Sequence, residues 1–291
     1  MPKKTTLSSF KRNLKQWVIR SHKNKPISDF RSSELTAIKA LADTNGSSVC
    51  LTVPIKKIRT LHDAAFSLGG HSFDPYALTA EQLLKNKNLS YKECFLYLYF
   101  KRVQPTNAAQ LLDVYNDRLI HAPPMSSVVP WRGKIDITGK RLHRKKRVEG
   151  KEQDGWNAMG PLTDRQVAFE HHRLRAILHL LTHKGWDDQH IQNFPNAEVL
   201  LKNTKEVFML RDGNHRLAAA SALGYDKVPV IIDSKERIID DYVVKNSKSV
   251  THNILTVNEA QSILDRVHKG KQPFFIEERW NNFLTGLARK T

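Results

Sequence analysis

One short stretch of the chain gathers five residues suited to anion binding and proton transfer: Asp212, Gly213, Asn214, His215 and Arg216. If a strand ends here and a helix begins, free backbone N–H groups and the positive end of the helix dipole meet at one point, which favours phosphate. Gly213 permits a positive φ, Arg216 can grip phosphate oxygens with two N–H groups, and His215 can move a proton. Asp212 can hold Mg²⁺, which commonly takes one or two carboxylates together with substrate phosphates. The stretch therefore predicts a phosphate site.

The same stretch also fits an ordinary helix start. Asp-Gly-Asn is a common turn and N-cap sequence, and Arg216 would then pair with Asp212 or with Glu170. Spacing alone leaves both interpretations open.

A second candidate, Glu170, lies in the most clearly predicted helix of the chain. Thr163 and Gln166 form a capping box at its start, and Gly185 marks its end. At 100° per residue Glu170 falls inside an apolar stripe, whose other members are Val167, Leu174, Ile177, Leu178 and Leu181.

A carboxylate on that stripe needs a physical explanation, because burial of an unpaired charge costs several kcal/mol, roughly. Either Arg173, three residues further on, pairs with Glu170, or the stripe opens there onto a polar pocket. If Glu170 is a general base, burial is expected to raise its pKa.

The elements around these candidates predict an α+β fold with a small mixed sheet and packed helices. We expect an edge strand over Val49–Ile55, a hairpin of Val199–Leu201 with Val207–Leu210, a helix over Asn214–Leu223 and a strand over 227–233. The region from 61 to 133 has mostly helical spacing, and a helix is expected to begin at Thr256.

Composition narrows the class of protein. The two cysteines, Cys50 and Cys94, are too few for a disulfide framework, which indicates a reducing compartment. No apolar run approaches the roughly 20 residues that a membrane-spanning helix needs. We therefore expect a cytoplasmic protein. The net charge of +18 favours phosphate-bearing partners of any kind.

Much of that charge lies in a basic arm, residues 1–28, and in a second basic run, residues 139–151. Apolar residues recur in the arm at helical spacing: Leu7, Phe10, Leu14, Trp17 and Val18. An amphipathic helix of this kind suits an anionic membrane surface at the inner membrane. The alternatives are a disordered tail or a helix packed on the body, and the second run also fits a solvated loop. Nucleic acid is a possible partner for both segments.

The order of "LTVPIKKI", "RLRAILHLLTHKGWD", "AEVLL" and "VFMLRDGNHRLAAASALGYDKVPVII" resembles the ParB/sulfiredoxin superfamily. The similarity is concentrated in residues 156–233, with a weaker piece near 49–57. It implies a domain over 29–245 with a mainly helical insertion at about 61–155, followed by a helical tail over 246–291. "GPLTDRQVAFEHHRL" is similar to uncharacterised members from bacterial surface-polysaccharide loci.

The resemblance implies nucleoside triphosphate binding. The Asp-Gly-Asn-His-Arg sequence at 212–216 looks closest to the Asp-Gly-x-His-Arg box of the free-serine kinase branch. Sulfiredoxin chemistry is excluded, because Asn214 stands where the nucleophilic cysteine would be, and no helix-turn-helix of the ParB type follows residue 234. By similarity, the residues from Gly213 to Arg216 would seat the phosphates, with Arg173 as a further binding candidate. Glu170 becomes the candidate base and His215 a second catalytic candidate.

These expectations predict a phosphotransferase that uses ATP, or another nucleotide, with Mg²⁺. Its acceptor would be a hydroxyl of a small polar molecule or a glycan, with Trp131 or Trp156 as a stacking wall or simply as core residues. Two alternatives remain: a ParB-like nucleic-acid-binding protein or nuclease, and a nucleotide-binding switch without catalysis.

Overall fold

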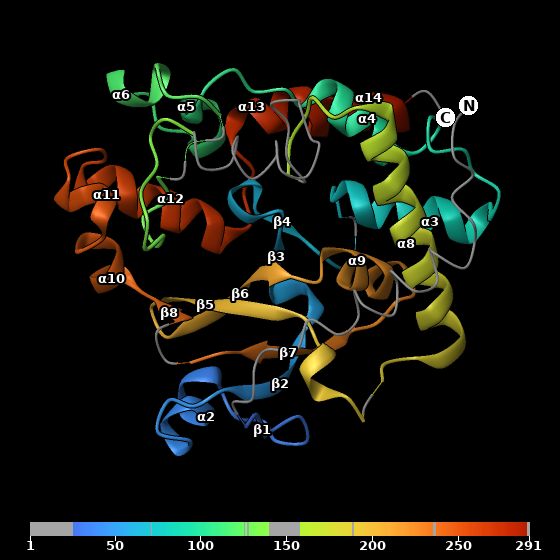
Figure 1. Ribbon diagram of the computed structural model, residues 1–291, viewed down its shortest axis with the longest axis horizontal. Helices are drawn as coiled ribbons and strands as arrows, with labels where there is room; N and C mark the ends of the chain where they lie inside the picture. Colours follow the sequence, from blue (N-terminus) through green and yellow to red (C-terminus); the bar gives the residue numbers. More distant parts are fainter. Residues whose placement is uncertain are drawn as a thin grey trace, which may run out of the picture.

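The computed structural model describes residues 26–70, 72–124, 126, 128–139, 158–187, 189–234 and 237–289. The predicted amphipathic segment from Leu7 to Val18, almost all of the second basic run, and Trp156 lie outside these residues. The described part combines one mixed sheet with helices, so the α+β class is confirmed (Figure 1).

Within the described residues the sheet has eight strands, in the order β1-β2-β7-β5-β6-β3-β4, with β8 beside β5. β1 with β2, β3 with β6, β5 with β7 and β5 with β8 pair in parallel, and the other pairs are antiparallel. The strands are β1 Ser28–Asp29, β2 Val49–Pro54, β3 Ile58–Thr60, β4 Phe66–Ser67, β5 Asn196–Lys202, β6 Lys205–Asp212, β7 Lys227–Ile232 and β8 Ile238–Ile239.

The hairpin of β5 and β6 is longer than the sequence predicts, and its turn consists of Asn203 and Thr204. Both residues have positive φ, 47° and 62°, as a tight two-residue hairpin turn requires. The edge position predicted for β2 is wrong over its first two residues, because β1 pairs with Val49 and Cys50. The region from 61 to 133 also contains β4, a strand too short to produce an alternating pattern.

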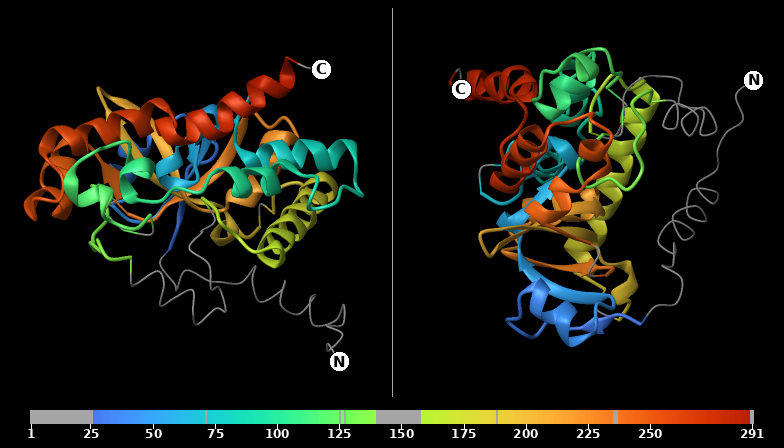
Figure 2. Two further views of the ribbon diagram at one scale, coloured as in Figure 1. Left: turned by 90° about the horizontal axis from the view of Figure 1, so that it is seen from above. Right: turned by 90° about the vertical axis from the view of Figure 1, so that its left-hand side faces the viewer.

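The helices are α2 Ala37–Asp43, α3 Pro75–Lys85, α4 Phe95–Arg102, α5 Ala108–Leu112, α6 Asp117–Ile120, α8 Asp164–Lys184, α9 Asn214–Ala222, α10 Asp241–Lys245, α11 Lys248–Thr251, α12 Val257–Lys269, α13 Phe274–Ile276 and α14 Asn282–Ala288. A five-residue π-helical turn, Glu277–Asn281, joins α13 to α14. The C-terminal helices run along one side of the molecule (Figure 2). None of the helices among the described residues is long and apolar enough to cross a membrane.

The two faces of the β5–β6 hairpin belong to different cores, because side chains alternate along a strand. Val199 and Phe208 join the core formed with α3, α8 and α9, whereas Leu200 and Val207 join a second core with α12. Figure 1 shows α3, α8 and α9 at one end of the molecule and α10 to α12 at the other. The sheet therefore separates two packed layers.

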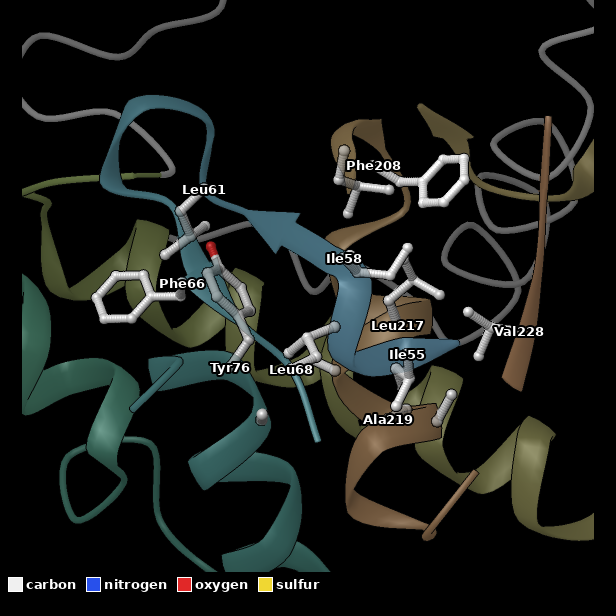
Figure 3. Packing of buried hydrophobic residues seen from close by; sticks show 14 of the residues in the cluster. Ile55, Ile58, Leu61, Phe66, Leu68, Tyr76, Phe208, Leu217, Ala219 and Val228 are labelled. Carbon is white, nitrogen blue, oxygen red and sulfur yellow. The ribbon is translucent and has the colours of Figure 1, made fainter. Parts of the chain in front are cut away.

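The predicted insertion contributes directly to the first core. α3 packs on both α9 and α8, and it buries Tyr76, Ala77, Ala80 and Leu83. In Figure 3, the hydroxyl end of Tyr76 points toward Leu61, another residue of this core. Three alanines of α9, Ala218, Ala219 and Ala220, are at most 1% exposed, and α3 and α8 both pack on this helix, so small side chains allow close approach to helices as well as to the sheet.

Candidate functional site

Glu170 lies on the inward face of α8 and is only 6% exposed to solvent. Three side chains surround its carboxylate. His215 Nε2 lies 2.9 Å from Oε2, Arg173 Nη1 lies 3.5 Å from Oε1, and the Tyr76 hydroxyl donates to Oε2 at 3.3 Å. The predicted ion pair with Arg173 is therefore present. The buried charge is compensated by two potential cations and one hydroxyl donor.

Three helices bring these groups together. α8 carries Glu170 and Arg173, His215 is the second residue of α9, and Tyr76 is the second residue of α3. The start of α3 is fixed by Asp74, whose Oδ1 accepts hydrogen bonds from the N–H groups of Tyr76 and Ala77. The Tyr76 ring also meets the His215 ring edge-on, with centroids 5.0 Å apart.

The expectation of a raised pKa for Glu170 is wrong. Burial does favour the protonated carboxyl, but the charges of His215 and Arg173 and the hydrogen bond of Tyr76 outweigh it. Together they hold the pKa of Glu170 below its ordinary value. The carboxylate is thus ionised at neutral pH, which is the form that can accept a proton.

Beside this carboxylate, α9 begins directly after β6, as the sequence predicts. Gly213 precedes the helix with φ 99° and ψ 19°, and a Cβ there would lie 2.8 Å from the Cβ of Pro195. Glycine is therefore required by both its backbone conformation and the space around it. Within the part of the chain that the structure describes, the N–H groups of Asn214, His215 and Arg216 have no hydrogen-bond acceptor. Unpaired N–H groups of this kind at a helix start favour an anion.

Arg216 and Asp212 flank this helix start. Arg216 Nη2 lies 3.4 Å from Asp212 Oδ2, and Asp212 Oδ1 accepts the N–H of Gly213. The Arg216 side chain is 26% exposed and the Asp212 side chain 69% exposed, so their contact faces solvent and contributes little energy. Burial lowers the pKa of Arg216, Asp212 opposes the shift, and the nearby charge of Arg173 adds to it. The positive charges of Arg173 and Arg216 therefore act on one another near the start of α9.

The structure accordingly gathers all seven candidate residues around the start of α9 and the middle of α8: Glu170, Arg173, Asp212, Gly213, Asn214, His215 and Arg216. The sequence analysis did not identify Tyr76, which belongs to the predicted insertion at about 61–155 and contacts Glu170. The Asp-Pro pair at 74–75 signals a helix start, but no local pattern indicates which residue Tyr76 would contact.

Trp131 does not contribute to this site. It packs against the second core, on the other side of the sheet from Glu170. The core interpretation of Trp131 is therefore correct, and the stacking wall proposed for it is wrong.

His171, next to the candidate base, is 3% exposed, and the burial of its ring, with the charges of Arg175 and His172, lowers its pKa from 6.5 to about 4. The unfolded chain takes up this proton below about pH 6.5, whereas the folded chain takes it up only near pH 4. We therefore expect His171 to lower the free energy of unfolding by up to about 1.4 kcal/mol for each pH unit as the pH falls from 6.5 to about 4. Above pH 6.5 it should have no such effect.

Urea unfolding at pH 7 and pH 5 measures this effect. His171→Gln should lose less free energy of unfolding between the two values than the unsubstituted chain, while His121→Gln, at an exposed histidine that follows α6, should behave like the unsubstituted chain. Equal losses in all three proteins would show that His171 is not excluded from protonation.

Searches of known protein families, characterised proteins and solved structures find no match to this chain. The site must therefore be interpreted from its own geometry.

Proposed function

We propose that this chain is a nucleotide-dependent phosphotransferase that transfers a phosphoryl group to a hydroxyl acceptor. One observation carries the proposal: an uncapped helix start with two guanidinium groups lies beside a buried, ionised carboxylate. The first arrangement suits a chain of phosphates, and the second suits removal of a proton from a hydroxyl. Their proximity is what a phosphoryl transfer requires.

The nucleotide phosphates would lie against the N–H groups at the start of α9, with Arg216 and Arg173 at their sides. An incoming phosphate would offer Arg216 a better partner than Asp212, because a charged, two-pronged contact replaces a weak solvent-facing one. Asp212, a single exposed carboxylate, suits Mg²⁺ that is held mainly by phosphates and water. The bound cation would neutralise phosphate charge.

Glu170 would accept the proton of the acceptor hydroxyl as that oxygen attacks the terminal phosphorus. Tyr76 and His215 hold one carboxylate oxygen, Oε2, and Arg173 approaches the other. These contacts hold the Glu170 carboxylate in one orientation before the acceptor binds. Phosphoryl transfer depends mainly on such positioning and on charge neutralisation, which polar groups supply best away from bulk water.

The resemblance to the ParB/sulfiredoxin superfamily supports the proposal of a nucleotide-dependent phosphotransferase and suggests ATP as the phosphoryl donor. Similarity to proteins of polysaccharide loci suggests a sugar or glycan acceptor. The basic arm, residues 1–28, would then hold the enzyme at an anionic membrane surface in the cytoplasm.

Isothermal titration with ATP, CTP and GTP, with and without Mg²⁺, tests the binding step. We expect one nucleotide to bind with 1:1 stoichiometry, and Arg216→Ala to weaken it about 10- to 100-fold, because a hydrogen bond to a charged group contributes about 1.5–3 kcal/mol. Arg175→Ala, on the exposed face of α8, is the matched control and should bind normally. If no nucleotide binds, the proposal fails; binding without transfer to any of a panel of sugars indicates a non-catalytic switch.

A further inference from the structure

Two histidines outside the proposed active site form a close pair on the last two turns of α8. His179 and His183 are four residues apart and exposed, and their ring centroids are 4.2 Å apart with 44° between the planes. Glu170 lies nine residues before His179, which at 100° per residue places it on the opposite side of the helix. The pair therefore belongs to a surface that the proposed phosphotransferase reaction does not use.

The orientation of one ring is fixed by the backbone. His183 Nδ1 lies 2.8 Å from the carbonyl oxygen of His179. Because a carbonyl can only accept, Nδ1 must carry the hydrogen, and Nε2 of the neutral ring then holds a free lone pair. Histidine ligands of metals are commonly oriented in this way, by a carbonyl that binds the other ring nitrogen. Among the described residues, neither Nε2 has a hydrogen-bond partner.

The position of the pair on the helix also favours a cation. α8 has 21 residues and ends at Lys184, so the negative end of its helix dipole lies at the last turn, next to His183. Imidazole nitrogens in turn suit late transition metals such as Zn²⁺, Cu²⁺ and Ni²⁺ better than Mg²⁺ or Ca²⁺.

We propose that His179 and His183 together bind one divalent late transition-metal ion. The described residues contain no cluster of three or more histidine, cysteine or acidic side chains that could hold a metal, so these two imidazoles would be the protein ligands and water would complete the coordination. A metal that bridges positions four residues apart links the last two turns of α8, and it should therefore stabilise the end of this helix.

Titration of the full chain with CuSO₄ and with ZnCl₂ tests the proposal. We expect one saturable site, with Cu²⁺ bound more tightly than Zn²⁺, and a rise in melting temperature on metal addition. His179→Ala and His183→Ala should each weaken that site at least about ten-fold and abolish the rise. His190→Ala, an exposed histidine after the helix, is the matched control and should leave both unchanged.

Pulsed electron paramagnetic resonance of the 1:1 Cu²⁺ complex counts the imidazole ligands directly. Two imidazoles in the unsubstituted chain and one in each alanine variant are expected. Unchanged affinity in both alanine variants, or the absence of a saturable site, would overturn the assignment. Nucleotide binding should be the same in all these variants, so the result is independent of the proposed phosphotransferase activity.

Discussion

Glu170→Gln is expected to lower kcat for phosphoryl transfer by at least about 100-fold, while nucleotide binding stays close to that of the unsubstituted chain. The glutamine side chain has the same size, and it retains a carbonyl oxygen that can accept from Tyr76. It cannot, however, take up the proton of an acceptor hydroxyl, and general bases contribute about 100- to 10,000-fold to such reactions. The measurement is the transfer of labelled γ-phosphate to the best acceptor in the sugar panel, together with calorimetric nucleotide titration.

Glu93→Gln provides the control for this substitution, because Glu93 is an exposed glutamate before α4 and lies outside the site. It should leave both transfer and binding unchanged. If Glu170→Gln instead keeps the full transfer rate and raises the melting temperature, Glu170 is a structural residue whose buried charge costs stability.

His215→Ala is expected to destabilise the fold by about 3 kcal/mol. The substitution removes the closest partner of a carboxylate that is 6% exposed, and breaking one side of a buried pair costs about 3–5 kcal/mol. Arg173 and Tyr76 remain beside Glu170, which favours the lower end of that range. Urea unfolding gives the free energy directly, and the melting temperature should fall by about 5–10 °C.

A double-mutant cycle separates this effect from the loss of packing. In the Glu170→Gln background, His215→Ala should lower the free energy of unfolding by less than it does in the unsubstituted chain, because no carboxylate charge is left without its partner. Equal costs in the two backgrounds would contradict the interpretation of an energetically coupled pair. The exposed His252→Ala should have little effect on stability.

The parts of the fold that local sequence signals determine could be predicted well. The capping box of Thr163 and Gln166 is present, and α8 ends before Gly185 as expected. The β5–β6 hairpin and the start of α9 after Gly213 also agree with the sequence, because turn and cap residues act over only a few positions. Each of these features depends on neighbours in the chain.

The features that were missed depend on contacts between distant segments. Tyr76 reaches Glu170 across 94 positions, and His215 reaches it across 45, so spacing along one helix could not reveal either contact. The same contacts explain why the pKa of Glu170 is lowered: the sequence indicates burial, but it does not indicate which charges offset that burial. Short strands such as β4 escaped prediction because two residues carry no periodicity.

The packing of α3 limits how far this protein can be trimmed. A shortened chain that lacks residues 61–155 would lose α3 and α4 and would leave Val167 and Leu174 of α8 uncovered. It would also remove Tyr76 from the Glu170 carboxylate. The strand-and-helix unit that looks minimal from the sequence would therefore be prone to aggregate, and stable truncations should be sought among variants that retain α3.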